Sequence, residues 1–289
     1  MSKVQVPVLM SSAGVPRVLH QIFLTGAEVN TRLPDPLRRN VEDMRSRNPG
    51  WEHRLYDDAA VDKFILEHYG EPMLSYYRRI DPSYGAARAD LFRYLAIYMH
   101  GGVYLDLKSR FTTPIDQVIR PDDCFVLSRW RNGPGEPHEG WGLHSDLAEA
   151  PGGEFQQWHV IGAPGHPFLR AVIERVISGI ERYCVRRTGV GGIGVLRLTG
   201  PIAYTLAIGP LIHRYPCRIV ANETALSLEY SVLDQSAHQG LFRQHYVANT
   251  SPVVRRPGVQ GILDRAFVNA REIKRGLLNR EPTLSADGQ

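Results

Sequence analysis

Apolar residues along the chain follow two alternating patterns, one with the period of a strand and one with the period of a helix. Short apolar runs bounded by turn residues predict strands at 18–24, 51–56, 103–108, 123–127 and 158–162, with one or two more in 218–232. Apolar positions at helical spacing predict helices within 34–48, 57–68, 84–100, 167–180 and 201–207. This alternation is typical of an α/β fold in which helices flank a mostly parallel central sheet.

The same patterns indicate one domain over residues 1–289, with residues 1–15 as a loose leader and 261–289 as a basic C-terminal helix and tail. Between 130 and 155, Gly, Pro, Trp and His interrupt any periodicity, and an irregular segment of this length is more often functional than idle. The spacing in Gly189–Gly194 matches GxGxxG, but no strand precedes it. We therefore expect a loop there and no dinucleotide site.

Composition narrows the classes of protein that the chain can belong to. With 43% apolar and 22% charged residues, it is neither a disordered chain nor a coiled coil or a collagen. Its 34 Lys and Arg exceed its 30 Asp and Glu, which gives a net charge of +4. The basic residues are dispersed, so we expect no nucleic-acid partner; an anionic ligand such as a phosphate is an alternative role for some arginines.

The three cysteines form no CxxC pair, which argues against a zinc or disulfide framework and fits a reducing compartment. The chain shows no secretory apolar segment near its start, and no uninterrupted apolar run approaches the roughly 18–20 residues of a membrane span. We expect a cytoplasmic protein, with the inner face of the membrane as a further location.

Candidate chemistry concentrates around Asp106, which follows the Gly101–Gly102 break at the end of a predicted strand. Ligands of open α/β sheets bind at the carboxyl ends of strands. Alternation would place Asp106 and Lys108 on one face of that strand. On the preceding helix, Asp90 and Arg93 are three residues apart and share a face. For each pair, an ordinary surface ion pair is the alternative.

Several blocks, in this order, carry a resemblance: Val15–Phe23, Asn48–Glu52, Tyr56–Asp58, Arg88–Tyr94 and Gly101–Lys108. Together they resemble the sugar-binding region of glycosyltransferase family 32. These are DXD-containing sugar transferases that include initiating mannosyltransferases and enzymes of capsular polysaccharide synthesis. Weaker similarity continues in Trp158–Pro167 and Thr199–Pro201.

The resemblance implies a GT-A fold, a Rossmann-like domain that binds a nucleotide sugar. It also implies transfer of a hexose, with retention, from a UDP- or GDP-sugar to a glycan or lipid-linked acceptor, as in bacterial surface polysaccharide synthesis. The donor-binding residues by position would be Gln21, Asp90, Arg93, Tyr104 and Asp106. Asp106 would be the first aspartate of the DXD motif and the central catalytic residue.

Lys108 departs from the family pattern, because it occupies the place of the second DXD aspartate. One hypothesis is that its ammonium stabilises the charge that develops on the leaving nucleoside diphosphate, so that Lys108 is catalytic. The other is that Mn²⁺ or Mg²⁺ does so, held by Asp106 and by His238 or His245 from the C-terminal part. Trp130, Trp141 and Trp158 could stack on sugar rings or fill the core. Asp146, Glu149 and Glu154 match no motif that assigns a nucleophile.

Two other functions stay open. Because Lys108 breaks the motif, the chain could be a non-catalytic relative that binds a nucleotide sugar or a glycan. The tail helix could bind a membrane surface or a nucleic acid through its basic residues, which are Arg265, Arg271, Lys274, Arg275 and Arg280. The alternative for the tail is a helix packed by Leu263, Phe267, Ile273 and Leu277 with its charges in water.

Overall fold

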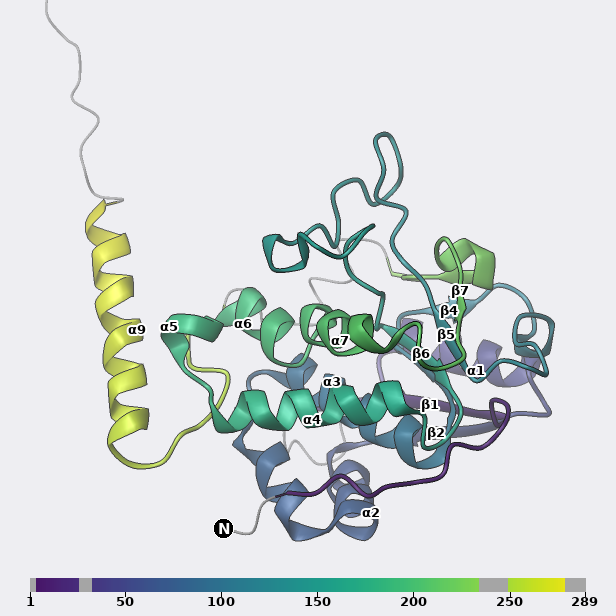
Figure 1. Ribbon diagram of the computed structural model, residues 1–289, viewed down its shortest axis with the longest axis horizontal. Helices are drawn as coiled ribbons and strands as arrows, with labels where there is room; N and C mark the ends of the chain where they lie inside the picture. The colour runs from purple at the N-terminus through teal and green to yellow at the C-terminus, as the bar shows by residue number, and fades with distance from the viewer. Residues whose placement is uncertain (1–3, 26–32, 234–248, 279–289) are drawn as a thin grey trace, which may run out of the picture.

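A central six-stranded sheet with helices on both faces forms the body of the protein (Figure 1). The computed structural model describes residues 4–25, 33–233 and 249–278, and it describes side chains as far as residue 270. The sheet strands are β1 (Val18–Ile22), β2 (Glu52–Tyr56), β3 (Gly102–Leu105), β5 (Phe125–Leu127), β6 (His159–Gly162) and β7 (Arg218–Ile219). A small second sheet joins β4 (Arg110–Phe111) to β8 (Leu228–Glu229).

The strand order is β2-β1-β3-β6-β5-β7. The pairs β1–β2, β1–β3 and β5–β7 are parallel, whereas β6 runs antiparallel to both β3 and β5. The predicted α/β fold, with a mostly parallel sheet flanked by helices, is confirmed in its layers and strand directions. Its antiparallel strand β6 pairs along the whole of β3, which brings the segment before β6 beside the end of β3.

Most predicted helices begin and end close to the observed positions, but the helix that starts at Asp58 continues through a kink at Gly70 to Arg79, whereas the sequence predicted it only as far as residue 68. In chain order the helices are α1 (Asp35–Arg47), α2 (Asp58–Arg79), α3 (Gly85–His100), α4 (Pro167–Glu181), α5 (Val185–Thr188), α6 (Gly191–Leu198), α7 (Pro201–Ile208) and α9 (Gly258–Leu278). Short 3₁₀ turns lie at Ile115–Gln117, Ser145–Leu147, Gly209–Leu211 and Glu223–Leu226. Asp57 caps α2 by accepting a hydrogen bond from the Ala60 amide, as its position predicts.

Each face of the sheet is buried in its own apolar core. Tyr104 of β3 points into the larger core, which α2, α3 and α4 cover. Val103 and Leu105 point into the other core, beside Met44 of α1. The alternation in β3 therefore follows the predicted period of two.

The strand predicted at 103–108 ends at Leu105, which corrects the sequence-based boundary. Residues 106–109 form a turn instead, in which the Ser109 amide donates to the Asp106 carbonyl at 2.9 Å. The side chain of Asn40 donates to the carbonyls of Leu107 and Ser109 at 2.9 Å each, so α1 holds this turn in place. Strand alternation therefore cannot be extended from Asp106 to Lys108.

The expected loop at Gly189–Gly194 is wrong, because helix α6 begins at Gly191. A Cβ on Gly194 would lie 2.9 Å from the Gly189 carbonyl oxygen, so the glycines permit a tight helix start rather than a nucleotide loop. The leader is also less loose than predicted. Val6 is buried, and Tyr98 donates a hydrogen bond to the Pro7 carbonyl at 2.7 Å.

Within the part of the chain that the structure describes, one segment, Gly191–Leu211, is long and apolar enough to cross a membrane, although the sequence has no uninterrupted apolar run there. In the fold this segment is broken into α6, α7 and a 3₁₀ turn, and 67% of its most apolar window is buried inside the protein. Its apolar character is therefore accounted for by packing against α3 and α4. The division into a single domain over residues 1–289 stays a prediction.

Candidate functional site

Asp106 lies directly after β3, at the carboxyl end of a fully buried strand. Its backbone amide donates to the Trp158 carbonyl at 3.0 Å, which continues the β3–β6 ladder by one residue. Its side chain keeps 24% of its surface exposed. A carboxylate fixed at the mouth of the sheet and still accessible can receive a hydroxyl or an amide of a ligand.

Arg93 of α3 connects Asp106 to the buried core. Its guanidinium lies 3.3 Å from Asp106 Oδ1 and 3.2 Å from Asp90 Oδ1, so one cation pairs with two carboxylates. It also stacks on the Tyr104 ring, with Cζ 4.5 Å from the ring centroid. The Tyr104 hydroxyl donates to Asp106 Oδ1 at 2.9 Å. These contacts fix one oxygen of Asp106 and orient the carboxylate.

Asp90 lies behind this contact and is fully enclosed. It accepts hydrogen bonds from the Thr199 hydroxyl at 2.9 Å and from the Gln157 amide at 3.1 Å. Burial raises the pKa of Asp90 above its ordinary value, although Arg93 opposes that shift. Because Asp90 and Arg93 are only 3% and 4% exposed, they orient Asp106 from within the protein. The structure does not test their predicted role in donor binding.

Lys108 and Tyr230 form the other side of the Asp106 turn. The Lys108 ammonium donates to the Tyr230 hydroxyl at 2.8 Å. Burial lowers the pKa of Lys108 below its ordinary value, while nearby Asp106 partly offsets this and Arg93 adds to it. The pairing of residue 108 with residue 230 brings a cation close to the exposed carboxylate. This juxtaposition suits an anion carrying a hydroxyl-rich group.

Aromatic rings surround Tyr230 and extend the site away from Asp106. Their ring centroids lie between 4.8 and 6.3 Å from a neighbour in the group, and the members are Trp130, His138, Trp141, Trp158 and Tyr230. Trp130 and Trp158 are buried, whereas Trp141 keeps 48% of its surface exposed. Of the three tryptophans singled out from the sequence, Trp141 therefore offers an open face to a ligand, and the other two support it.

The segment 130–155 is held against the sheet by a buried carboxylate. Glu154 accepts from the Trp130 indole at 2.7 Å and pairs with His144 at 2.8 Å. This hydrogen bond to Glu154 raises the pKa of His144, although burial opposes it. Asp146 pairs instead with Arg197. Glu154 and Asp146 therefore help to hold this segment in place. Glu149 is exposed.

Gln21 is completely buried in β1, where its side-chain oxygen Oε1 lies 2.7 Å from His53 Nε2 in a hydrogen bond. Its amide nitrogen has no hydrogen-bond partner among the described residues. His238 and His245, the two candidate metal ligands from the C-terminal part, lie outside the described residues. Donor binding by Gln21 and metal binding by His238 both stay predictions.

The described residues provide a limited donor set for a metal. Across residues 4–25, 33–233 and 249–270, no three His, Cys, Asp or Glu side chains gather closely enough to hold an ion. Around Asp106 they supply one carboxylate and, in Lys108, one ammonium. This set fits Mn²⁺ or Mg²⁺ only where other oxygens, such as those of a diphosphate, complete the coordination.

Sequence reasoning did not single out Gln157, Tyr230 or Thr199 as parts of this site. In the sequence, Thr199 belongs only to a Thr-Gly-Pro helix start. In the structure its hydroxyl donates a hydrogen bond to Asp90. Gln157 lies two residues before the β6 strand, and its proximity to Asp106 follows only from the pairing of β6 with β3. Tyr230 gave no local signal, since its role comes from a contact with Lys108 across 122 positions of the chain.

Comparison with known proteins finds relatives for the part of the chain that carries these residues. Residues 34–126, which include Asp90, Arg93, Asp106 and Lys108, match a family model described as a glycosyltransferase sugar-binding region containing a DXD motif. The chain is 27% identical over 164 residues to an initiation-specific alpha-1,6-mannosyltransferase of Candida albicans, covering 56% of this chain and 42% of that protein.

A protein of the same name from Schizosaccharomyces pombe is 26% identical over 215 residues, covering 69% of this chain and 52% of the relative. The chain thus spans about half the length of these relatives. Among solved structures, the PaToxG glycosyltransferase aligns with a TM-score of 0.48 at 16% identity, over 81% of this chain and 87% of that one.

Proposed function

We propose that this chain, which contains the sugar-binding region of the DXD glycosyltransferases, transfers a hexose from a nucleotide-sugar donor to a glycan acceptor. The observation that carries the proposal is the Asp106 turn. There an accessible carboxylate, fixed by Arg93 and Tyr104, lies near the partly buried ammonium of Lys108, after the carboxyl end of β3. The relatives named as mannosyltransferases support mannose as the sugar.

In the proposed reaction the bond between the anomeric carbon and the diphosphate oxygen breaks. A new bond forms from that carbon to an acceptor hydroxyl oxygen, whose proton passes to the departing nucleoside diphosphate. Asp106 would accept hydrogen bonds from hydroxyls of the donor and thereby orient it. Lys108 would place its ammonium against the diphosphate, where negative charge increases as the sugar leaves. Trp141 would stack on a sugar ring at the open side of the aromatic group.

A divalent ion is compatible with this proposal. Asp106, together with diphosphate oxygens of a UDP- or GDP-sugar, would hold Mn²⁺ or Mg²⁺, and when bound the ion would polarise the diphosphate. Turnover compared with Mn²⁺ and with EDTA tests this part. Retention, a lipid-linked acceptor and a role in bacterial surface polysaccharide also stay predictions. The configuration of the anomeric carbon in the product tests retention.

The central experiment measures release of nucleoside diphosphate from UDP- and GDP-sugars by the purified chain and by Asp106→Asn. We expect the variant to keep its fold but to lose activity on the order of 100-fold or more, because the amide cannot supply the negative charge. Asp122→Asn is the control, since Asp122 is an exposed loop carboxylate. It should retain wild-type turnover.

Wild-type activity in Asp106→Asn would refute the assignment of this site. Tight binding of a nucleotide sugar by the wild-type chain without any turnover would instead identify a non-catalytic relative. Circular dichroism of both variants distinguishes either outcome from loss of the fold.

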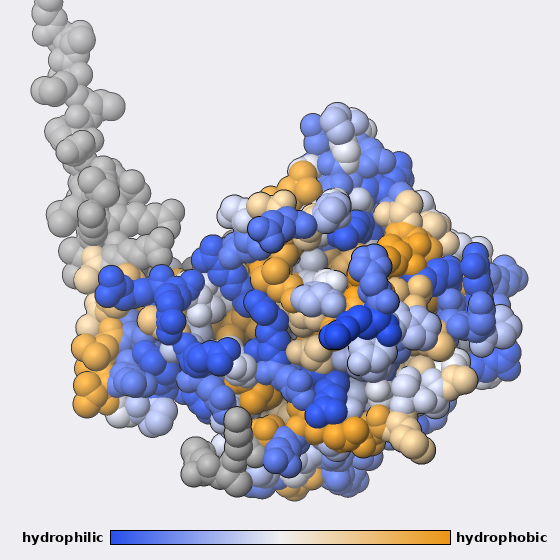
Figure 2. Space-filling model, viewed as in Figure 1, coloured by the Kyte–Doolittle hydropathy of each residue, from blue (hydrophilic) through white to orange (hydrophobic). Residues whose placement is uncertain are grey.

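We further propose that α9 brings the protein to an anionic membrane surface, on the cytoplasmic side. Val259, Ile262 and Leu263 of this helix are 69%, 58% and 61% exposed. Helical spacing places them on one face, opposite the buried Asp264 and Val268. Figure 2 shows apolar surface along the outer edge of this helix, at the left of the view. Exposed Arg265 and the basic residues that follow in the sequence suit anionic lipid headgroups.

Sedimentation with vesicles tests this contact. The wild-type chain should bind vesicles that contain an anionic lipid more strongly than purely zwitterionic ones. Leu263→Glu should weaken that binding, because it places a charge in the apolar face. Gln260→Glu adds the same charge beside this face and should weaken it less. Equal binding by the wild-type chain and Leu263→Glu would contradict the proposal.

A further inference from the structure

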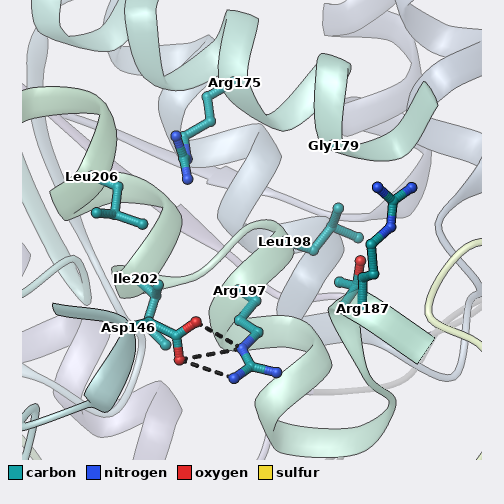
Figure 3. A pocket seen from close by; sticks show the side chains of 9 residues that line it. Asp146, Arg175, Gly179, Arg187, Arg197, Leu198, Ile202 and Leu206 are labelled. Carbon is teal, nitrogen blue, oxygen red and sulfur yellow. Dashed lines mark hydrogen bonds and ion pairs between the residues drawn. The ribbon is translucent and has the colours of Figure 1, made fainter. Parts of the chain in front are cut away.

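A cavity of about 300 Å³ lies among α4, α5, α6 and α7, and its lining does not include Asp106 or Lys108. Three arginines from different helices stand around it: Arg175 from α4, Arg187 from α5 and Arg197 from α6 (Figure 3). The helices come together through the packing of α4 against α6 and α7. No local sequence pattern predicts this cluster, because its three arginines lie on separate helices.

The charge of the cavity is not balanced by its own residues. Asp146 is the one carboxylate among the lining residues, so two positive charges are in excess. For the Arg175 guanidinium, no hydrogen bond or ion pair joins it to any described residue. Burial lowers the pKa of Arg175, and Arg182 adds to that effect. Arg175 and Arg187 are exposed and Arg197 is partly buried. Like charges gathered around one hollow raise the local positive potential, which favours an anionic ligand.

The contact between Arg197 and Asp146 shows what kind of anion fits. Arg197 Nε lies 3.0 Å from Asp146 Oδ1, and its Nη2 lies 3.0 Å from Oδ2. The guanidinium therefore already presents its two donors to a planar pair of oxygens. Phosphate oxygens are recognised by the same bidentate geometry. An incoming phosphate would compete with Asp146 for Arg197.

Gly179, Thr188, Leu198, Ile202 and Leu206 complete the lining of the cavity. Leu198 and Ile202 are only 3% and 1% exposed, whereas Leu206 is partly exposed and lies on the side of the cavity opposite Arg187 (Figure 3). A free phosphate would leave the accessible face of Leu206 uncovered, whereas a phosphate with an apolar substituent would cover it. The volume is at the lower end of the range for small-ligand pockets, so it suits one such group.

We propose that this cavity binds a phosphate group through Arg175, Arg187 and Arg197, with Leu206 receiving the apolar part of the molecule that carries it. The cavity would bind this ligand whether or not the chain transfers a sugar. When no ligand is bound, Asp146 pairs with Arg197. Because Asp146 belongs to the segment 130–155, the ligand would also release one of the contacts that hold that segment.

Calorimetric titration of the full chain with inorganic phosphate and with octyl phosphate tests the proposal. We expect saturable binding of both ligands, and tighter binding of octyl phosphate. Arg175→Ala and Arg187→Ala should each weaken both ligands about tenfold. Leu206→Asn should weaken octyl phosphate alone, and Asp146→Asn should strengthen both by freeing Arg197.

Arg170→Ala is the matched control, because Arg170 lies on α4 outside the cavity and pairs with Glu174 at 2.9 Å. It should bind both ligands as the wild-type chain does. Equal affinity for the two ligands would overturn the role of Leu206 and assign the cavity to free phosphate. Absence of saturable binding, or affinity unchanged by Arg175→Ala and Arg187→Ala, would overturn the proposal altogether. Circular dichroism confirms that each variant is folded.

Discussion

Arg93 determines how Asp106 is presented. A guanidinium buried between two carboxylates and above a tyrosine ring can point in only one way, and it leaves one Asp106 oxygen committed to the protein. A lysine at this position could not reach the same set of acceptors, because it lacks the planar fork. The Asp106 carboxylate is therefore oriented before any ligand arrives, which reduces the cost of orienting it during binding.

At Lys108 the expected outcome depends on pH. If its ammonium stabilises the leaving diphosphate, activity falls as pH rises through the Lys108 pKa, which burial holds below its ordinary value of 10.5. Lys108→Arg should move this alkaline loss to higher pH, because a guanidinium stays charged. The measurement is turnover against pH for both proteins. An alkaline loss at the same pH in Lys108→Arg would exclude Lys108 as its origin.

Among the elements, β3 depends on the two glycines that end α3. Gly101 and Gly102 have positive φ values of 65° and 99°. A Cβ on Gly102 would lie 2.4 Å from the Val18 carbonyl oxygen of β1. Only glycine lets the chain turn this close to β1 and start β3. Asp106 then follows at the carboxyl end of β3.

Gly102→Ala should therefore lower the free energy of unfolding by roughly 2 kcal/mol or more, from backbone strain and from the clash with β1. Gly85→Ala is the control, because nothing lies within 4 Å of its would-be Cβ. That variant should be as stable as the wild type or slightly more stable. Urea unfolding measures both, and equal stability of the two variants would contradict this account of β3.

Across the whole molecule, burial keeps several histidines neutral. His20 and His159 lie in the sheet with 0% and 1% exposure, and burial lowers the pKa of each to about 3. The His20 ring bonds the Tyr56 hydroxyl at 3.0 Å and the Gly101 carbonyl at 3.1 Å. The fold is thus built around uncharged imidazoles, two of them on strands of the central sheet.

These histidines predict how stability depends on pH. The unfolded chain binds protons to them as pH falls below about 6.5, whereas the folded chain does not do so until about pH 3. Stability is therefore lost as pH falls through that window, by about 2 kcal/mol per histidine between pH 7 and pH 5. Urea unfolding at both pH values measures it.

His20→Gln should show a smaller loss between pH 7 and pH 5 than the wild type, whatever its stability at pH 7. His213→Gln, at an exposed position, should keep the wild-type difference. The same difference in His20→Gln as in the wild type would show that His20 is not neutral in the fold.

The sequence by itself determined the elements and their order. The period of apolar residues predicted β1, β2 and helices α1, α3 and α4 closely, and the start of α2, because each pattern depends on neighbours within one turn or one strand. It also placed Asp106 at the end of a buried strand and paired Asp90 with Arg93 on one helix face. Local spacing is enough for these features.

Only the tertiary structure decided which distant residues meet. It ended β3 at Leu105, brought Tyr230 to Lys108, and turned the glycines at 189–194 into the start of a helix. It also gathered three arginines from three helices around one cavity. Such contacts depend on how closely packed elements approach and on which polar groups burial leaves to be paired. The apolar period of a single segment predicts neither of these conditions.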